Sequence, residues 1–235
     1  MHDINTELEL NALFEDIAPM GTKKVAVVIG RFNPPTKGHY AVINSVIKFI
    51  DKNKKLGLEA IPIVLVIGGS KSDNDKKRNP LSVAERIQFM KASGNANRAT
   101  FMEGTNAFKA LEAIREKGFE PIAVAAGSDR IDAYIEILDK YFKTPDGQNI
   151  PHSKIVLTRD EDAVETNKEA KQISMDQLLS AAKGKEIDIK NVSGSLARRA
   201  VELGYEDEFA SIVGLSNKPV LAKKLFSLIS KAIKE

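Results

Sequence analysis

The chain has 235 residues, 43% hydrophobic and 29% charged, which is typical of a globular protein that buries a core without disulfides or metals. It has no cysteine, which excludes a disulfide framework, a thiolate nucleophile and a cysteine-based zinc site. The net charge of +3 is too small to predict nucleic-acid binding, and no apolar run approaches the roughly 20 residues of a transmembrane helix. We therefore expect a cytoplasmic protein that binds neither nucleic acid nor a membrane.

Residues 1–22 carry few structural signals. Several apolar residues could form a short amphipathic helix, but we favour an N-terminal extension on the surface that ends near Pro19 and Gly21. The first segment of the folded domain is KKVAVVIG (23–30), a continuous β-branched run that ends at a glycine. Such a run is typical of a strand that is buried on both faces.

Strands and helices are predicted to alternate after this first strand. Apolar residues at helical spacing predict a helix over 39–50, and Ser82 with Glu85 forms a capping box that starts another. The predicted strands cover 61–67, 99–102, 121–127 and 154–159, and the predicted helices cover 83–90, 107–117, 131–141, 196–203, 206–212 and 219–233. This alternation predicts an α/β protein with a doubly wound parallel sheet.

Ligands of such sheets bind outside the carboxyl ends of the strands. This rule places the candidate functional residues in 30–39, in 68–78, in 127–130 and at Arg159. The first of these segments, GRFNPPTKGH, has two adjacent prolines that stiffen the connection between strand and helix. The helix N-terminus near His39 suits a phosphate, Gly38 leaves room for a ligand, and Thr36 and His39 can point at one anion.

These residues resemble the signature of the nucleotidylyltransferase superfamily, G-x-F-x-P-x-[HT]-x-G-H. The matching residues are Gly30, Phe32, Pro34, Thr36, Gly38 and His39. The resemblance implies a Rossmann-like (HUP-type) nucleotidylyltransferase fold with C-terminal helices. It implies that Thr36 and His39 act on the triphosphate as catalytic residues. It also implies that the nucleotide is bound by Gly30, Arg31, Phe32 and Gly38. Lys37 or Lys77 is a further catalytic candidate, because a cation there could neutralise charge on the phosphates.

A second motif, VSGSLAR (192–198), is similar to the I-S-S-T-x-x-R motif of the same superfamily. Ser193, Ser195 and Arg198 fall in place, whereas Gly194 replaces the middle serine. A serine-capped helix that carries an arginine is an anion site, although such a cap is also a common structural feature. The resemblance implies that Ser193 and Ser195 bind the nucleotide and that Arg198 is catalytic.

Two further segments resemble the superfamily in the middle of the chain. In DKKRNPLSVAERIQFM (75–90), Lys77, Arg78 and Arg86 match basic residues that contact phosphate or substrate; a solvated basic loop with a surface arginine is the alternative. In AAGSDR (125–130), Gly127 and Asp129 match a substrate contact, and Asp129 could instead cap the next helix. We expect one nucleotidylyltransferase domain over 23–215. The final helix, within 216–235, is expected to pack on the core or on a partner copy, which leaves a homo-oligomer open.

The function implied by the resemblance is transfer of a nucleotidyl group from a nucleoside triphosphate to a small phosphate-bearing acceptor, with release of pyrophosphate. The first motif is most similar to nicotinamide-nucleotide adenylyltransferases, so ATP and nicotinamide mononucleotide are the favoured substrates and NAD the favoured product. Mg²⁺ is expected to accompany the triphosphate, and no set of metal ligands is predicted in the chain itself.

Several alternatives stay open. A pantetheine-phosphate adenylyltransferase or a cytidylyltransferase would share this scaffold, although the R-T of the cytidylyl form of the second motif is missing here. A non-catalytic nucleotide sensor is another alternative, because Thr36 and Gly194 depart from the commonest pattern. The segment GGSKS (68–72) does not have Walker A spacing. Class I aminoacyl-tRNA synthetases are disfavoured because the chain lacks a KMSKS loop.

Overall fold

The computed structural model of the chain describes residues 23–55, 57, 59–68, 75–128, 130–143, 147–149, 151–157, 168–183 and 185–234. The predicted N-terminal extension and the candidate residues Asp129 and Arg159 lie outside these ranges.

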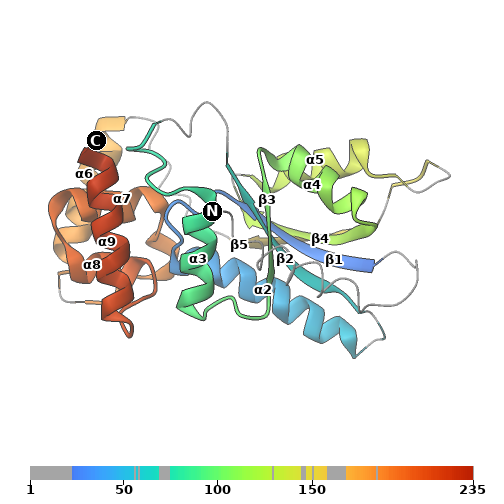
Figure 1. The fold of residues 1–235 in the computed structure, drawn as a ribbon, viewed down its shortest axis with the longest axis horizontal. Coiled ribbons are helices and arrows are strands. Elements are labelled where there is room, and N and C mark those ends of the chain that lie inside the picture. The colour runs from blue at the N-terminus through green and yellow to red at the C-terminus, as the bar shows by residue number, and fades with distance from the viewer. Residues whose placement is uncertain are drawn as a thin grey trace, which may run out of the picture.

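In the described residues, five parallel strands form one sheet in the order β3-β2-β1-β4-β5 (Figure 1). Their bounds are β1 Lys23–Gly30, β2 Ile61–Ile67, β3 Thr100–Gly104, β4 Phe119–Gly127 and β5 Ser153–Leu157. The doubly wound parallel sheet is confirmed, with strand bounds within two residues of the prediction. β1 is buried at the centre between β2 and β4, which explains its continuous apolar run.

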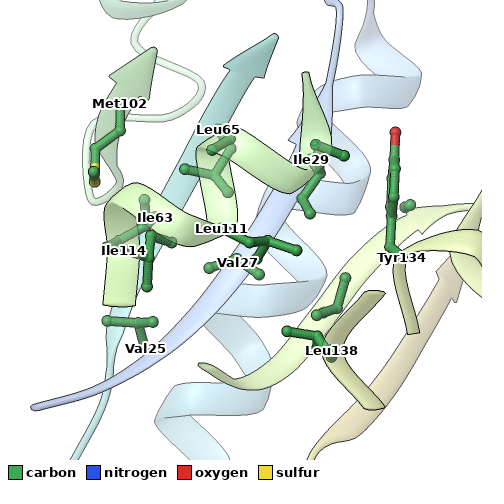
Figure 2. Close-up of a cluster of buried hydrophobic side chains, with 14 of the residues drawn as sticks. Val25, Val27, Ile29, Ile63, Leu65, Met102, Leu111, Ile114, Tyr134 and Leu138 are labelled. Carbon is green, nitrogen blue, oxygen red and sulfur yellow. The ribbon is translucent and has the colours of Figure 1, made fainter. Parts of the chain in front are cut away.

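Helices cover both faces of the sheet (Figure 1). One face packs on α2 Lys37–Lys54 and α3 Val83–Ser93, and the other on α4 Ala107–Glu116 and α5 Ile131–Tyr141. Because side chains alternate along a strand, Val25, Val27 and Ile29 of β1 contact α4 and α5, as Figure 2 shows. Ala26 and Val28 contact α2 instead. The two apolar layers fix the position of the strand ends.

The C-terminal part of the chain forms a separate helical cluster beside one end of the sheet (Figure 1). Its elements are α6 Lys168–Ala181, the 3-10 helix η3 Ile189–Asn191, α7 Gly194–Leu203, α8 Glu206–Ile212 and α9 Pro219–Lys234. α9 contacts α3, α7 and α8 of its own chain, and Leu225 and Ile229 are buried there. The helix α6 was not predicted. It is held by the burial of Leu179 and by a bidentate ion pair between Asp176 and Arg199 of α7, and neither contact has a local sequence signal.

Candidate active site

A cavity of about 620 Å³ lies at the carboxyl ends of β1, β2 and β4. Its opposite wall is the N-terminus of α7. The polar side chains that line it include arginines, a histidine, serines and two asparagines: Arg31, Asn33, His39, Arg78, Asn79, Arg130, Tyr134, Ser193, Ser195 and Arg198. Four arginines and no carboxylate are among the described lining residues, so the cavity is built for an anion.

Ten of the predicted site residues line this cavity together. They are Gly30, Arg31, Phe32, Gly38, His39, Arg78, Gly127, Ser193, Ser195 and Arg198. The two motifs therefore meet in space although more than 150 residues of chain separate them. Four other predicted residues are not among the described lining residues: Thr36, Lys37, Lys77 and Arg86.

Thr36 is fully buried and contacts His39. It is the N-cap of α2, and its backbone N–H donates to Nδ1 of His39 across 3.0 Å, with Oγ1 at 2.9 Å from the same nitrogen. Because Nδ1 accepts the N–H, the ring is the tautomer that carries its proton on Nε2. Thr36 was predicted to contact the triphosphate. In the structure its side chain is fully buried, is not among the described lining residues and contacts His39, which suits a residue that orients the histidine.

Phe32 supports the same histidine from the other side. Its ring lies 5.0 Å from the ring of His39, centroid to centroid, and its backbone has a φ of +52°. A Cβ at position 30 would lie 3.0 Å from Cζ of this ring, so Gly30 is required for the close approach of Phe32. The imidazole is thus fixed by a hydrogen bond on one edge and by an aromatic contact on another.

Asn33 joins the first motif to the loop before α3. Its side chain is buried, its Nδ2 donates to the carbonyl of Leu81 at 3.0 Å, and its Oδ1 accepts from the N–H of Leu81 at 3.2 Å. The carbonyl of Asn33 accepts from Nη1 of Arg198 at 2.5 Å. This residue therefore links three segments that build the cavity, and a loop held in this way is preorganised.

The N-terminus of α7 forms the second half of the site. Ser193 is its N-cap and accepts from the N–H of Leu196 at 3.1 Å, as predicted for a serine-capped helix. Arg198 also donates from Nη2 to Oγ of Ser195 at 3.2 Å. A Cβ at Gly194 would lie 3.0 Å from the carbonyl oxygen of Asn33. The glycine that departs from the superfamily pattern thus lets α7 approach the first motif.

Arg198 lies close to two other positive charges, those of Arg31 and Arg78. Burial lowers the pKa of its guanidinium, and the nearby charges of Arg78 and Arg31 lower it further, whereas Glu202 and Asp75 oppose the shift. An arginine stays protonated even so, because its ordinary pKa lies far above neutrality. The protein therefore maintains a concentration of like charges that a bound polyphosphate would relieve.

Lys37 points away from the cavity. Its ammonium donates to the carbonyl of Ile187 and lies 3.4 Å from a carboxylate oxygen of Glu186. Next to it, a Cβ at Gly38 would lie 3.1 Å from Cγ2 of Val192. Both residues therefore hold the N-terminus of α2 against the segment that leads into α7. Gly38 was expected to make room for a ligand, and this packing gives a further reason for the glycine.

Two other basic residues that were predicted to contact phosphate or substrate lie outside the cavity, and they differ in exposure. Lys77 is exposed in the loop before α3. Arg86, predicted to contact phosphate or to be a surface arginine, is instead 1% exposed and donates to three backbone carbonyls, those of Arg31, Ile67 and Ser82.

Four polar lining residues were given no role from the sequence. Asn33 and Arg130 lie in the candidate segments 30–39 and 127–130, whereas Asn79, in the loop before α3, and Tyr134, in α5, lie just outside the candidate segments. The position of Arg130 is the signal that could have identified it, because it follows β4 at the edge of the sheet where ligands bind. Tyr134 comes one helical turn later and hence lies on the same side of α5.

The described residues do not form a metal site of their own. Among them, no group of three or more His, Asp or Glu side chains lies close enough to hold a metal ion. The cationic lining of the cavity also does not fit a bare divalent cation. Within the same residues, no helix is long and apolar enough to cross a bilayer.

Comparison with known proteins places the chain in a family. A family model described as Cytidylyltransferase-like matches residues 27–181, which is more than half of the chain. Among solved structures, the chain is similar to a lipopolysaccharide core biosynthesis protein from Thermoplasma volcanium GSS1, at 18% identity and a TM-score of 0.40, over 57% of this chain and 97% of that one. No curated protein gives a significant match. Because the model matches more than half of the chain, the chain belongs to the Cytidylyltransferase-like family of nucleotidyltransferases. The matched region includes the ends of β1, β2 and β4 that line the cavity.

Proposed function

We propose that this protein transfers AMP from ATP to nicotinamide mononucleotide and releases NAD and pyrophosphate. Family membership supports a nucleoside triphosphate donor and a phosphate-bearing acceptor in general. The observation that carries the proposal is the convergence of two helix N-termini, those of α2 and α7, with His39 and Arg198 at one cavity. The choice of ATP and of this acceptor rests on the similarity of GRFNPPTKGH to nicotinamide-nucleotide adenylyltransferases.

The chemistry needs positioning and charge neutralisation rather than a nucleophilic side chain. An oxygen of the acceptor phosphate attacks the α-phosphorus in line, the bond between the α-phosphorus and the bridging oxygen to the β-phosphorus breaks, and pyrophosphate leaves with the electron pair. The Nε2–H of His39 donates to an oxygen on which negative charge develops. Arg31, Arg78 and Arg198 offset the charge of the phosphates.

Mg²⁺ is proposed to enter with the nucleoside triphosphate, because the described residues offer no set of carboxylates to hold it. When bound, the ion would supply further charge neutralisation to the phosphates. The residues of the chain are assigned no direct bond to it.

A cytidylyltransferase is the second candidate, and the description of the matching family favours it. The test is a panel of reactions in which ATP or CTP is paired with nicotinamide mononucleotide, pantetheine phosphate, glycerol phosphate or choline phosphate, with pyrophosphate as the readout. Release with ATP and nicotinamide mononucleotide supports the leading proposal. Release only with CTP and an alcohol phosphate would replace it, and tight ATP binding without turnover in any pair would indicate a nucleotide sensor.

A further inference from the structure

Arg86 is a buried charge that has no place in the chemistry above. It is the fourth residue of α3, and its side chain is among the largest that are fully buried. A guanidinium that leaves water is costly unless hydrogen bonds compensate it. In the described part of the chain, every fully buried side-chain nitrogen and oxygen has a hydrogen-bond partner. The location of the partners of Arg86 therefore indicates what this charge is for.

The hydrogen bonds of Arg86 join two neighbouring strand ends. Nη1 donates to the carbonyl of Arg31 at 2.6 Å and to that of Ile67 at 2.9 Å, and Nε donates to the carbonyl of Ser82 at 3.1 Å. Gly30 and Val66 are the last residues of β1 and β2 that pair with each other. Arg31 and Ile67 come directly after that pair, and Ile67 still pairs with Gly104 of β3. Arg86 thus connects the two segments just beyond the last β1–β2 pair.

Both of these carbonyls belong to residues that line the cavity. Arg31 is followed by Phe32, whose ring packs on His39. A shift of the Arg31 carbonyl would therefore move the side chain that fixes the imidazole. The path from Arg86 to the reacting centre has two steps, and each is a contact in the structure.

We infer that Arg86 is a positioning residue of the nucleotidyl-transfer site: it bridges the ends of β1 and β2 and thereby sets the place of Arg31, Phe32 and His39. This inference rests on the proposed function only for its kinetic readout. A direct phosphate contact is the rival explanation, and at 1% exposure it would require the guanidinium to leave its three carbonyls.

The experiment compares Arg86→Lys and Arg86→Met with the wild type. Arg115→Met is the matched control, because Arg115 is exposed on α4 and donates to the carbonyl of Tyr141 at 3.2 Å, away from the cavity. For each protein, kcat and KM for ATP, the Kd for inorganic pyrophosphate by calorimetry, and unfolding in urea are measured well below the melting temperature.

We expect kcat to fall about 100-fold in Arg86→Met and about 10-fold in Arg86→Lys, because a small misplacement of reacting groups costs rates of this order. If Arg86→Met does not fold, Arg86→Lys keeps the test decisive, because its ammonium can still donate to carbonyls. The Kd for pyrophosphate should change less than about 3-fold, because the arginines that line the cavity remain. Two outcomes would overturn the inference. One is a kcat within about 3-fold of wild type in both variants, and the other is a pyrophosphate Kd weakened more than about 10-fold, which would indicate a direct phosphate contact.

A readout without turnover separates this inference from the proposed function. The ¹⁵N signals of the His39 ring should shift in Arg86→Lys and stay unchanged in Arg115→Met. Unshifted signals in Arg86→Lys would overturn the positioning role even if the wild type were inactive with every substrate pair. Conversely, an inactive wild type with shifted signals would contradict the proposed function and leave the positioning role supported.

Discussion

Replacement of His39 by asparagine tests whether the Nε2–H donor of the imidazole accelerates the reaction. The carboxamide oxygen of an asparagine can still accept from the N–H of Thr36, which lies 3.0 Å from Nδ1 in the wild type, but the side chain has no atom at the place of Nε2. The cap of α2 should therefore survive while the donor is lost. Loss of one preorganised donor costs about 3–4 kcal/mol of transition-state stabilisation, or 10²–10³-fold in kcat.

Replacement of Thr36 by valine should be much milder. Valine keeps the backbone N–H that donates to Nδ1 and removes only Oγ1, which lies 2.9 Å from the same nitrogen. A single neutral hydrogen bond contributes about 0.5–1.5 kcal/mol, so kcat should fall no more than about 10-fold. The order of the two effects follows from the burial of Thr36, because a fully buried hydroxyl acts only through the histidine.

The assay is pyrophosphate release at saturating substrates, with the substrate pair that the panel identifies. His152→Asn is the matched control, since this histidine precedes β5, at the opposite end of that strand from its carboxyl end, and is not among the described cavity residues. Urea unfolding shows whether each variant is folded. If Thr36→Val reduced kcat as much as His39→Asn, Thr36 would act on the substrate directly and the argument from burial would be refuted.

Three further predictions concern Gly194, Lys37 and Tyr40. Gly194→Ala should lower kcat about 10-fold despite the better helix propensity of alanine, because its Cβ would lie 3.0 Å from the Asn33 carbonyl oxygen that an active-site arginine also needs; unchanged turnover would show that the loop yields. Lys37→Met should lower the free energy of unfolding by about 1–2 kcal/mol and leave kcat within about 3-fold, because the ammonium donates to the Ile187 carbonyl; a large loss of kcat at unchanged stability would restore it as a catalytic residue. Burial raises the pKa of Tyr40 to about 12, so its contribution to stability is complete below pH 10 and about 3 kcal/mol is lost as the pH rises towards 12. In urea unfolding at pH 9 and 11.5, Tyr40→Phe should lose less stability than the wild type, and equal losses would contradict this assignment.

The fold could be predicted because its central strands β1, β2 and β4 are buried on both faces and because α3, α4 and α7 begin at a side-chain cap. The apolar run of β1 and the capping box at Ser82 are local signals, and both lie where they were expected. The helix α6 was not predicted. Its attachment comes from Asp176 and Arg199, which are far apart in the sequence, so only the tertiary structure reveals it.

The site could be predicted in part, for a different reason. A motif places residues on an element and so brings Gly30, His39 and Arg198 to one cavity. The motif does not determine which group each side chain contacts. Lys37 and Arg86 carry charges that suit phosphate, yet their hydrogen bonds go to backbone carbonyls of the same protein. Charge alone cannot distinguish a ligand contact from a structural one, because both satisfy the same donors.

The two departures from the superfamily pattern fit an intact site better than a degenerate one. A threonine at position 36 cannot supply positive charge, but its hydroxyl lies 2.9 Å from Nδ1 of His39. Its backbone N–H, which any residue except proline would have, donates to the same nitrogen and selects the tautomer that donates from Nε2. A glycine at position 194 lacks a hydroxyl, but it permits Asn33 to accept from Arg198. A protein that only senses nucleotides has no need to control an imidazole tautomer, since the bound phosphates could be held by the arginines alone. The precision at His39 is therefore the strongest structural argument that the cavity performs chemistry, and it makes turnover rather than binding the property to measure first.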